Sequence, residues 1–366
     1  MTLQIGIVGL PNVGKSTLFN ALTRAGAQVA AYPFTTIESN RGVVAVPDPR
    51  LEALAALVGP QQVTPATVEF VDIAGLVRGA HRGEGLGNQF LGHIRNVDAI
   101  VLVCRCFSNP DVAHVEGTVD PLRDLEVLDL ELTLADLEVV ERRLEKVRSA
   151  AKARPRDYAA ELGTLEELRA RLQAGERAAA WAAGGADEAA LAREMCLLTA
   201  RERIYVANVG EEDLPDGGPL AREIARVAKA QGAPAVVMCA QLEADLSEWP
   251  PDEAAAYRAD VGLERSGLEA LAQAGYAVLD LLTFFTITGG REVRAWAIPR
   301  GTQAPQAAGK VHTQMERGFI RAEVVDFEQL VEAGSWLAAR ERGTLRVEGR
   351  DYEVQDSDVC LFRFNP

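Results

Sequence analysis

Short apolar runs alternate with amphipathic segments at the start of the chain and again after about residue 200. Leu3 to Val8, Val68 to Val71 and Ala99 to Cys106 are apolar runs of strand length. Ser16 to Arg24 repeats its apolar residues on one helical face. The alternation returns after Ile204, where two strand patterns flank a helical one. Strands that alternate with helices indicate an α/β domain.

A different period begins at about Pro121, where apolar residues recur at alternating spacings of three and four, as in a coiled coil. The predicted seam is Leu130, Thr133, Leu137, Val140, Leu144, Val147 and Ala151. Lys152 to Arg156, which contains Pro155, predicts a turn, and leucines from Leu162 to Leu172 predict a second helix. We therefore expect an antiparallel helical hairpin inserted into the α/β domain.

The chain from Thr283 onward consists of short strand patterns and turns, with helical patterns only at Ala304 to Lys310 and Phe327 to Ala333. The predicted strands are Phe284 to Thr288, Val293 to Ile298, Ile320 to Val325, Leu345 to Val347, Tyr352 to Val354 and Val359 to Phe364. We expect a small separate α+β module. The predicted boundaries are 1–120 and 201–282 for the α/β domain, 121–200 for the helical insertion and 283–366 for the last module.

The loop between the first strand and the first helix fits the pattern Gly-x4-Gly-Lys-[Ser/Thr], which binds nucleotide phosphates. Its glycines let backbone N–H groups face a polyphosphate, and the helix N-terminus adds partial positive charge. Lys15 would reach the β- and γ-phosphates, and the Ser16 hydroxyl would coordinate Mg²⁺. The loop residues expected to bind nucleotide are Asn12, Val13, Gly14, Lys15, Ser16 and Thr17.

The second strand ends in Asp72-Ile73-Ala74-Gly75, where such a nucleotide domain needs a DxxG motif. Asp72 is expected to hold Mg²⁺ through water, and the Gly75 N–H to contact the γ-phosphate. Thr36 is the candidate for a second hydroxyl on Mg²⁺, with Thr35 as the alternative. We expect the segments 32–37 and 75–87 to act as switches that respond to the γ-phosphate.

The base-binding position carries Asn208-Val209-Gly210-Glu211 where GTPases of this class have Asn-Lys-x-Asp. Glu211 is one methylene longer than Asp, and Val209 replaces the stacking Lys. Because a base pocket that loses its matched carboxylate loses discrimination, we expect ATP to be preferred and GTP to bind more weakly.

The usual water-orienting Gln after DxxG is absent, since Leu76 follows Gly75. His114 is the first candidate for a substitute catalytic group, and His81 is the second. Alternatively, the amide of Asn12 could coordinate a monovalent cation such as K⁺ beside the phosphates.

The formal net charge of −15 argues against nonspecific coating of nucleic acid, so any RNA contact must use a local basic patch. The cluster Arg142, Arg143, Lys146, Arg148, Lys152, Arg154 and Arg156 near the hairpin tip is either such a contact or a solvated face. Five cysteines without metal spacing suggest reduced core thiols. No membrane span or signal peptide is evident, so we expect a cytoplasmic protein with no membrane or DNA partner.

These motifs together resemble the YchF, or Obg-like ATPase, family, and the resemblance extends over essentially the whole chain. It is carried by the loop from Gly9 to Thr17, Asp72 to Val77, Gly83 to Asn88, Asn208 with Glu211, Val293 to Trp296 and Ala304 to His312. The resemblance implies an α/β P-loop NTPase domain with a doubly wound sheet, an inserted α-helical coiled coil and a C-terminal α+β TGS domain of β-grasp fold.

The resemblance also implies a function and a set of site residues. It implies preference for ATP, use of Mg²⁺ and binding to the ribosome, particularly the large subunit. It places metal hydroxyls at Ser16 and Thr36, the base-binding segment at Asn208, Val209 and Glu211, and catalysis at His114. Two alternatives stay open: a GTPase with an atypical base pocket, and a ribosome-binding adaptor for which nucleotide is only a structural ligand.

Overall fold

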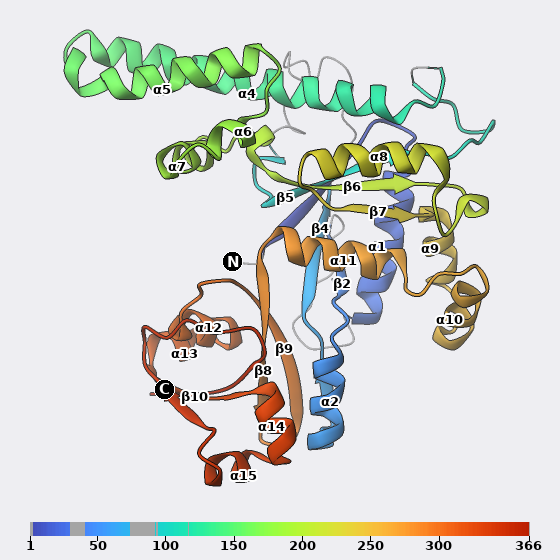
Figure 1. Cartoon of the computed structure of the whole chain (residues 1–366), viewed down its shortest axis with the longest axis vertical. Coiled ribbons are helices and arrows are strands. Elements are labelled where there is room, and N and C mark those ends of the chain that lie inside the picture. The colour runs from blue at the N-terminus through green and yellow to red at the C-terminus, as the bar shows by residue number, and fades with distance from the viewer. Residues whose placement is uncertain (1–2, 30–40, 74–91, 93, 116, 366) are drawn as a thin grey trace. The chain divides into compact units, whose positions relative to one another are not determined.

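The computed structural model describes residues 3–29, 41–73, 92, 94–115 and 117–365 (Figure 1). These residues divide into two compact units. The first contains residues 3–24, 41–42 and the described part of 70–267. The second contains residues 25–29, 43–69 and 268–365. No helix among the described residues is both long and apolar enough to cross a membrane.

The first unit is built on a six-stranded sheet with the order β2-β4-β1-β5-β6-β7. Its strands are β1 (Gln4–Val8), β2 (Arg41–Ala45), β4 (Thr67–Asp72), β5 (Ala99–Arg105), β6 (Glu202–Asn208) and β7 (Ala235–Met238). β1, β5, β6 and β7 pair in parallel, and every residue of β5 is buried. The α/β prediction is therefore confirmed, and the loops that follow these parallel strands meet at one edge of the sheet.

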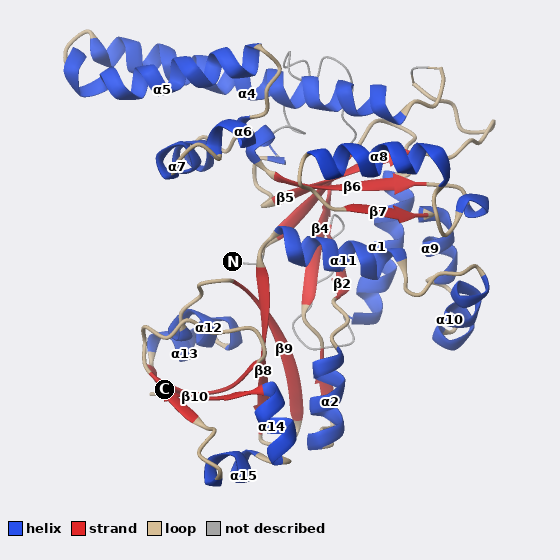
Figure 2. Cartoon of the chain, viewed as in Figure 1, coloured by secondary structure: helices blue, strands red, loops and turns tan. Residues whose placement is uncertain are grey.

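Four helices of this unit lie after strands β1, β6 and β7 in the chain, with α9 and α10 both after β7. They are α1 (Lys15–Val29), α8 (Gly218–Ala230), α9 (Ala240–Leu246) and α10 (Pro251–Asp260). α8 buries Ala221, Ile224 and Ala228 and contacts β6 and β7. Figure 2 shows this helix running beside the two strands. The alternation of strand and helix places α1 directly after the phosphate loop and α9 directly after β7.

The predicted helical hairpin is present as α4 (Pro121–Ala151) and α5 (Pro155–Gln173), which lie side by side in Figure 1. Short helices α6 (Ala178–Ala182) and α7 (Ala186–Glu194) follow. The hairpin core contains Val140, Leu144, Val147, Leu165, Leu168 and Leu172. Asp120 caps α4 by accepting a hydrogen bond from the N–H of Arg123.

Two details of the hairpin differ from prediction. Leu130, expected in the seam, is 57% exposed, because the first half of α4 packs against β5 and α8 and only its second half meets α5. Pro155, expected inside the turn, is the first residue of α5. Proline is tolerated there because N–H groups in the first turn of a helix have no hydrogen-bond partner within the helix.

The second unit is built on a six-stranded sheet with the order β11-β10-β12-β8-β9-β3. Its strands are β3 (Gln62–Thr64), β8 (Leu281–Thr288), β9 (Glu292–Pro299), β10 (Phe319–Asp326), β11 (Arg346–Glu348) and β12 (Asp358–Phe364). Its helices include α2 (Pro49–Val58), α11 (Gly267–Val278), α12 (Ala304–Val311), α13 (Thr313–Arg317), α14 (Phe327–Ala333) and α15 (Trp336–Glu341). β12 pairs in parallel with β8, and β8 pairs antiparallel with β9, as in a β-grasp sheet.

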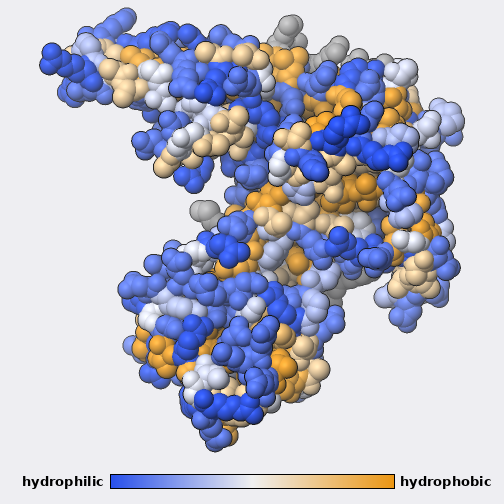
Figure 3. All heavy atoms as spheres, viewed as in Figure 1, coloured by the Kyte–Doolittle hydropathy of each residue, from blue (hydrophilic) through white to orange (hydrophobic). Residues whose placement is uncertain are grey.

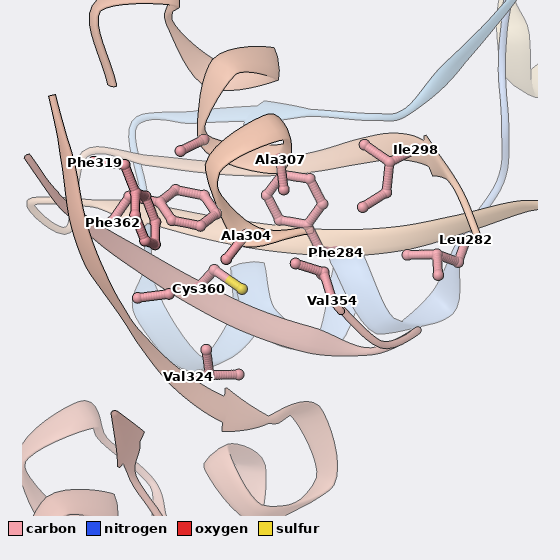
Figure 4. Close-up of a cluster of buried hydrophobic side chains, with 12 residues drawn as sticks. Leu282, Phe284, Ile298, Ala304, Ala307, Phe319, Val324, Val354, Cys360 and Phe362 are labelled. Carbon is pink, nitrogen blue, oxygen red and sulfur yellow. The ribbon is translucent and has the colours of Figure 1, made fainter. Parts of the chain in front are cut away.

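One of the two hydrophobic clusters of this second unit forms between α12 and the sheet (Figure 4), and the other contains residues of α2, α14 and α15. Ala304 and Ala307 of α12 face Phe284 and Phe362, and small side chains on the helix let it lie close to the aromatic rings. The ring centroids of Phe284 and Phe362 are 5.9 Å apart in an edge-to-face arrangement. The predicted α+β module is thus a packed domain with its own core.

The two compact units follow other boundaries than the domains expected from the sequence. β3 pairs in parallel with β9, and α2 packs against β9, so residues 43–69, which include the end of β2 and the start of β4, cluster with the second unit. Residues 268–282 also belong to this unit. The predicted strand Tyr352 to Val354 is wrong, because only an isolated bridge between Gln303 and Glu353 forms there.

The cysteines match the prediction of unpaired thiols. Cys104, Cys106, Cys239 and Cys360 are buried, and Cys196 is half-buried.

Candidate functional site

The phosphate loop connects the end of β1 to the start of α1 in a conformation that its sequence favours. Gly14 has φ +97°, and a Cβ built there would lie 2.2 Å from Nδ2 of Asn208. Asn12 has φ +63°, in the left-handed region that asparagine tolerates better than most residues. Glycine is therefore required at position 14 both by its dihedral angle and by the close approach of Asn208.

Lys15 lies in the loop with only 8% of its surface exposed, and its Nζ donates to the carbonyl oxygen of Leu10 at 2.5 Å. Burial lowers the pKa of Lys15 to about 8, although the negative charge of Asp72 opposes this change. Burial likewise raises the pKa of Asp72, and Lys15 opposes it. The buried ammonium of Lys15 and the carboxylate of Asp72 thus lie close enough for each to favour the charged form of the other.

Asn208 braces this loop from the end of β6. Its Nδ2 donates to the carbonyl oxygen of Val13 at 2.9 Å, and its Oδ1 accepts from the N–H of Ala240 at 2.9 Å. Asn208 is 4% exposed. One buried amide side chain therefore ties the phosphate loop to the N-terminus of α9, in addition to any contact with a nucleotide.

Val209 and Glu211, which follow Asn208 in the chain, differ in their exposure to solvent. Val209 is 2% exposed, and its N–H donates to the carbonyl oxygen of Met238. Glu211 begins the short 3-10 helix η3 (Glu211–Asp213) and is exposed. Its Oε1 accepts a hydrogen bond from the hydroxyl of Tyr257, which raises the pKa of that tyrosine. The Glu211 carboxylate therefore already has a protein partner.

A pocket of about 490 Å³ brings most of the predicted residues together at the edge where β1, β5, β6 and β7 end. It is lined by Asn12, Gly14, Lys15, Ser16, Thr17, Phe107, Ser108, Asn109, Val112, Asn208, Val209, Gly210, Glu211, Glu212, Cys239, Ala240, Gln241 and Leu242. A volume of this size suits a small organic ligand. The phosphate loop lies on one side, and the residues after β5, β6 and β7 form the rest.

His114 lies outside this lining. Its side chain is 2% exposed, and its Nε2 is 2.9 Å from Oδ2 of Asp124, which is itself buried in the first turn of α4. The preceding residue, Ala113, touches the loop, because its carbonyl oxygen accepts from Nδ2 of Asn12 at 3.0 Å. The structure therefore places His114 one residue from a phosphate-loop contact, with its imidazole held by α4.

Several predicted residues fall outside the described residues: Thr36, its alternative Thr35, Gly75, Leu76 and His81. Both predicted switch segments lie largely in the same gaps.

Sequence reasoning missed Arg105, Phe107, Asp124 and Tyr257. Of these, Arg105 could have been noticed in the sequence, because it is a charged residue at the end of an otherwise apolar central strand. Asp124 and Tyr257 left none, because their partners lie 10 and 46 residues away in the chain.

Family models match both ends of the chain. A model described as "50S ribosome-binding GTPase" matches residues 4–140, and the model YchF-GTPase_C, described as "Protein of unknown function (DUF933)", matches residues 281–365.

Comparison with whole proteins extends this similarity to the full length. The chain is 48% identical to "Ribosome-binding ATPase YchF" of Escherichia coli O157:H7 and 46% identical to the protein of that name in Bacillus subtilis, each over 100% of both chains. The solved structure named "Structure of the Schizosaccharomyces pombe YchF GTPase" superposes with a TM-score of 0.88 at 35% identity, over 99% of this chain and 98% of the other. With a phosphate loop of this geometry and relatives this similar over their full length, the chain belongs to the YchF family.

Proposed function

We propose that this protein is a Mg²⁺-dependent P-loop ATPase that binds the ribosome and changes conformation with its nucleotide state. One observation carries the nucleotide part: a phosphate loop with a buried Lys15, braced by Asn208, opens into a pocket of about 490 Å³. Full-length relatives that are named ribosome-binding ATPases support the rest.

ATP is the preferred nucleotide in this proposal. A GTPase of this class uses an Asp carboxylate to accept two hydrogen bonds from guanine, whereas here the longer Glu211 accepts a hydrogen bond from Tyr257 through Oε1. Val209 supplies no cation and no long side chain to lie over a base. The printed names of the relatives differ on this point, since the bacterial proteins are named ATPases and the yeast structure a GTPase. Nucleotide preference is therefore the first property to measure.

The residues around Lys15 fit Mg²⁺. Ser16 offers a hydroxyl in the first turn of α1, and Asp72 offers a half-buried carboxylate at the end of β4, which neighbours β1 in the sheet. Oxygen ligands of this kind are those that Mg²⁺ prefers. Within the described part of the chain no cluster of three His, Cys, Asp or Glu side chains forms a metal site. Ser16 and Asp72, with Thr36, would therefore hold a Mg²⁺ that also binds the nucleotide phosphates and neutralises their charge.

Catalysis is assigned to His114, with a K⁺ ion held by Asn12 as the alternative source of positive charge. For Asn12, the amide nitrogen is engaged by Ala113, which leaves the amide oxygen as the atom for a cation. For His114, the pairing of Nε2 with Oδ2 of Asp124 holds the imidazole against α4. The pairing with a residue of α4 links the catalytic group to the helical hairpin.

Ribosome binding is assigned to the large subunit, through the hairpin tip. Arg142, Arg143 and Arg148 form ion pairs with glutamates. Lys146, Lys152, Arg154 and Arg156 are exposed and form no ion pair among the described residues. Figure 3 shows the end of the hairpin as largely hydrophilic. Unpaired cations there would contact RNA phosphates on an otherwise acidic protein, and action on the ribosome places the protein in the cytoplasm.

The decisive experiment is calorimetric titration of the purified protein with ATP and with GTP in the presence of Mg²⁺, followed by phosphate release with and without 50S and 30S subunits. We expect tighter binding of ATP and faster turnover with 50S subunits. The double variant Val209→Lys, Glu211→Asp restores the guanine motif and should shift preference toward GTP. Tighter binding of GTP by the wild type would establish the GTPase alternative. Ribosome binding without phosphate release under any condition would establish the adaptor.

A further inference from the structure

Arg105 is a buried arginine whose donors are directed to the backbone of a single loop. It is the last residue of β5 and is 2% exposed. Its Nη2 donates to the carbonyl oxygens of Val112 at 2.9 Å and Asn109 at 3.3 Å. Its Nε donates to that of Phe107 at 3.3 Å, and its Nη1 to that of Ala113 at 3.4 Å.

The guanidinium of Arg105 has no ion-pair partner within 4 Å among the described residues. It instead lies 4.6 Å from the centroid of the Phe107 ring. A buried guanidinium without an ion-pair partner is costly, and its four carbonyl partners, one aromatic ring and the negative charge of Asp124 offset that cost. A planar group with five donors suits this task, because it can hold several carbonyls in fixed relative positions.

The loop that Arg105 holds is one wall of the nucleotide pocket. Phe107, Ser108, Asn109 and Val112 all line that pocket. The loop also reaches the phosphate side, since the carbonyl oxygen of Ala113 accepts from both Arg105 and the amide of Asn12. Arg105 therefore connects the pocket wall after β5 to the phosphate loop after β1 through a shared carbonyl.

We propose that Arg105 is a positioning residue for nucleotide binding: it holds residues 107–113 in the shape that forms the pocket wall and keeps Asn12 in place. Since nucleotide binding is part of the proposed function, this inference rests on it. Arg105 lines no part of the pocket itself, and the imidazole of His114 is held by Asp124 and not by Arg105. Its loss should therefore weaken nucleotide binding far more than it slows the chemical step.

Arg203 provides a matched control on the neighbouring strand. It lies on β6, it is also 2% exposed, and its guanidinium pairs with Asp129 of α4 at 2.5 Å. It is absent from the pocket lining. Replacing either arginine removes a buried guanidinium from the same sheet, so both variants should lower the melting temperature. Only the change at Arg105 should alter the nucleotide site.

The experiment compares Arg105→Met, Arg105→Lys and Arg203→Met by direct ATP and GTP titration, steady-state hydrolysis and thermal unfolding of the full chain. For Arg105→Met we expect the Kd and KM for ATP to rise by about tenfold or more while kcat changes by less than about threefold. The ratio of GTP to ATP affinity should move toward one, because the pocket wall is no longer fixed. Arg105→Lys keeps the charge but cannot hold four carbonyls, so it should lie between Met and the wild type.

A double-mutant cycle separates positioning from general destabilisation. If Arg105 acts through Ala113 on Asn12, then Asn12→Ala should weaken ATP binding much less in the Arg105→Lys background than in the wild type. Equal changes in Kd for the Arg105 and Arg203 variants, or a change in melting temperature alone, would overturn the assignment. Should Arg105→Met not fold, the lysine variant decides. Should the wild type bind ATP without hydrolysing it, the proposed ATPase function fails while the Kd comparison still tests Arg105.

Discussion

Asn208→Ala tests whether the asparagine of the base motif acts chiefly as a brace of the phosphate loop. The side chain forms two buried hydrogen bonds, to the carbonyl oxygen of Val13 and from the N–H of Ala240, both at 2.9 Å. Alanine would remove both and leave the two backbone groups to find other partners.

The expected magnitude follows from these two bonds. A backbone group left buried without its partner costs about 1–3 kcal/mol, so the loss of both bonds should cost about 2–6 kcal/mol of stability in this unit. Only the bond to Val13 acts on the phosphate loop directly. Its share of about 1–3 kcal/mol corresponds to roughly 5- to 160-fold weaker nucleotide binding.

The assay is calorimetric titration of wild type and variant with ATP, GTP and the two diphosphates. Because the brace shapes the loop around the phosphates, affinity should fall by about the same factor for every nucleotide, whatever its base. Asn208→Asp keeps the acceptor for Ala240 but sets a carboxylate against the Val13 carbonyl, so it should recover stability at α9 without recovering affinity. A loss confined to one base, or an affinity within twofold of wild type, would refute the brace.

Three further outcomes are expected. Burial lowers the pKa of Lys15 from its usual 10.5 to about 8, so the folded state binds fewer protons than the unfolded state between these values. We therefore expect the difference in unfolding free energy between the nucleotide-free wild type and Lys15→Met to rise by about 1 kcal/mol from pH 7 to pH 9, as measured by denaturant unfolding. A fall in this difference over the same pH range would contradict the burial of Lys15. The pairing of His114 with Asp124 is tested by Asp124→Asn, which should speed phosphate release by the free protein by a few fold if Asp124 restrains a catalytic His114, because about 1 kcal/mol of hydrogen bonding is lost. Adding His114→Ala should abolish this gain. Slower phosphate release by Asp124→Asn would mean that Asp124 orients the imidazole instead. Leu168→Ala should destabilise the hairpin by about 2–4 kcal/mol, as measured by hydrogen exchange, because Leu168 is buried in the hairpin core. Leu130→Ala should cost less than about 0.5 kcal/mol, because Leu130 is 57% exposed. Equal costs for the two variants would mean that Leu130 packs in the seam between the helices after all.

The sequence alone determined the elements whose signal is local. The phosphate loop, the strand before it and the helix after it follow from residues that are neighbours in the chain, and glycine at position 14 has the positive φ that the motif predicts. The hairpin follows in the same way from apolar spacing, since the buried Val140, Leu144 and Val147 are those that the period selects. Local periodicity failed at Leu130, where a different partner covers the first half of the helix.

Tertiary structure decided which of the predicted residues meet, and through which atoms. Asn208 reaches Val13 across 195 positions of sequence, and no local pattern could show that its amide braces the loop. β3 joins β9 across more than 200 positions, which moved residues 43–69 into the second unit. His114 was selected as a loop histidine near the phosphates, yet its imidazole is buried against Asp124. Periodicity reports which face of an element is buried, but hydrogen-bond partners depend on how distant elements pack, and that information exists only in three dimensions.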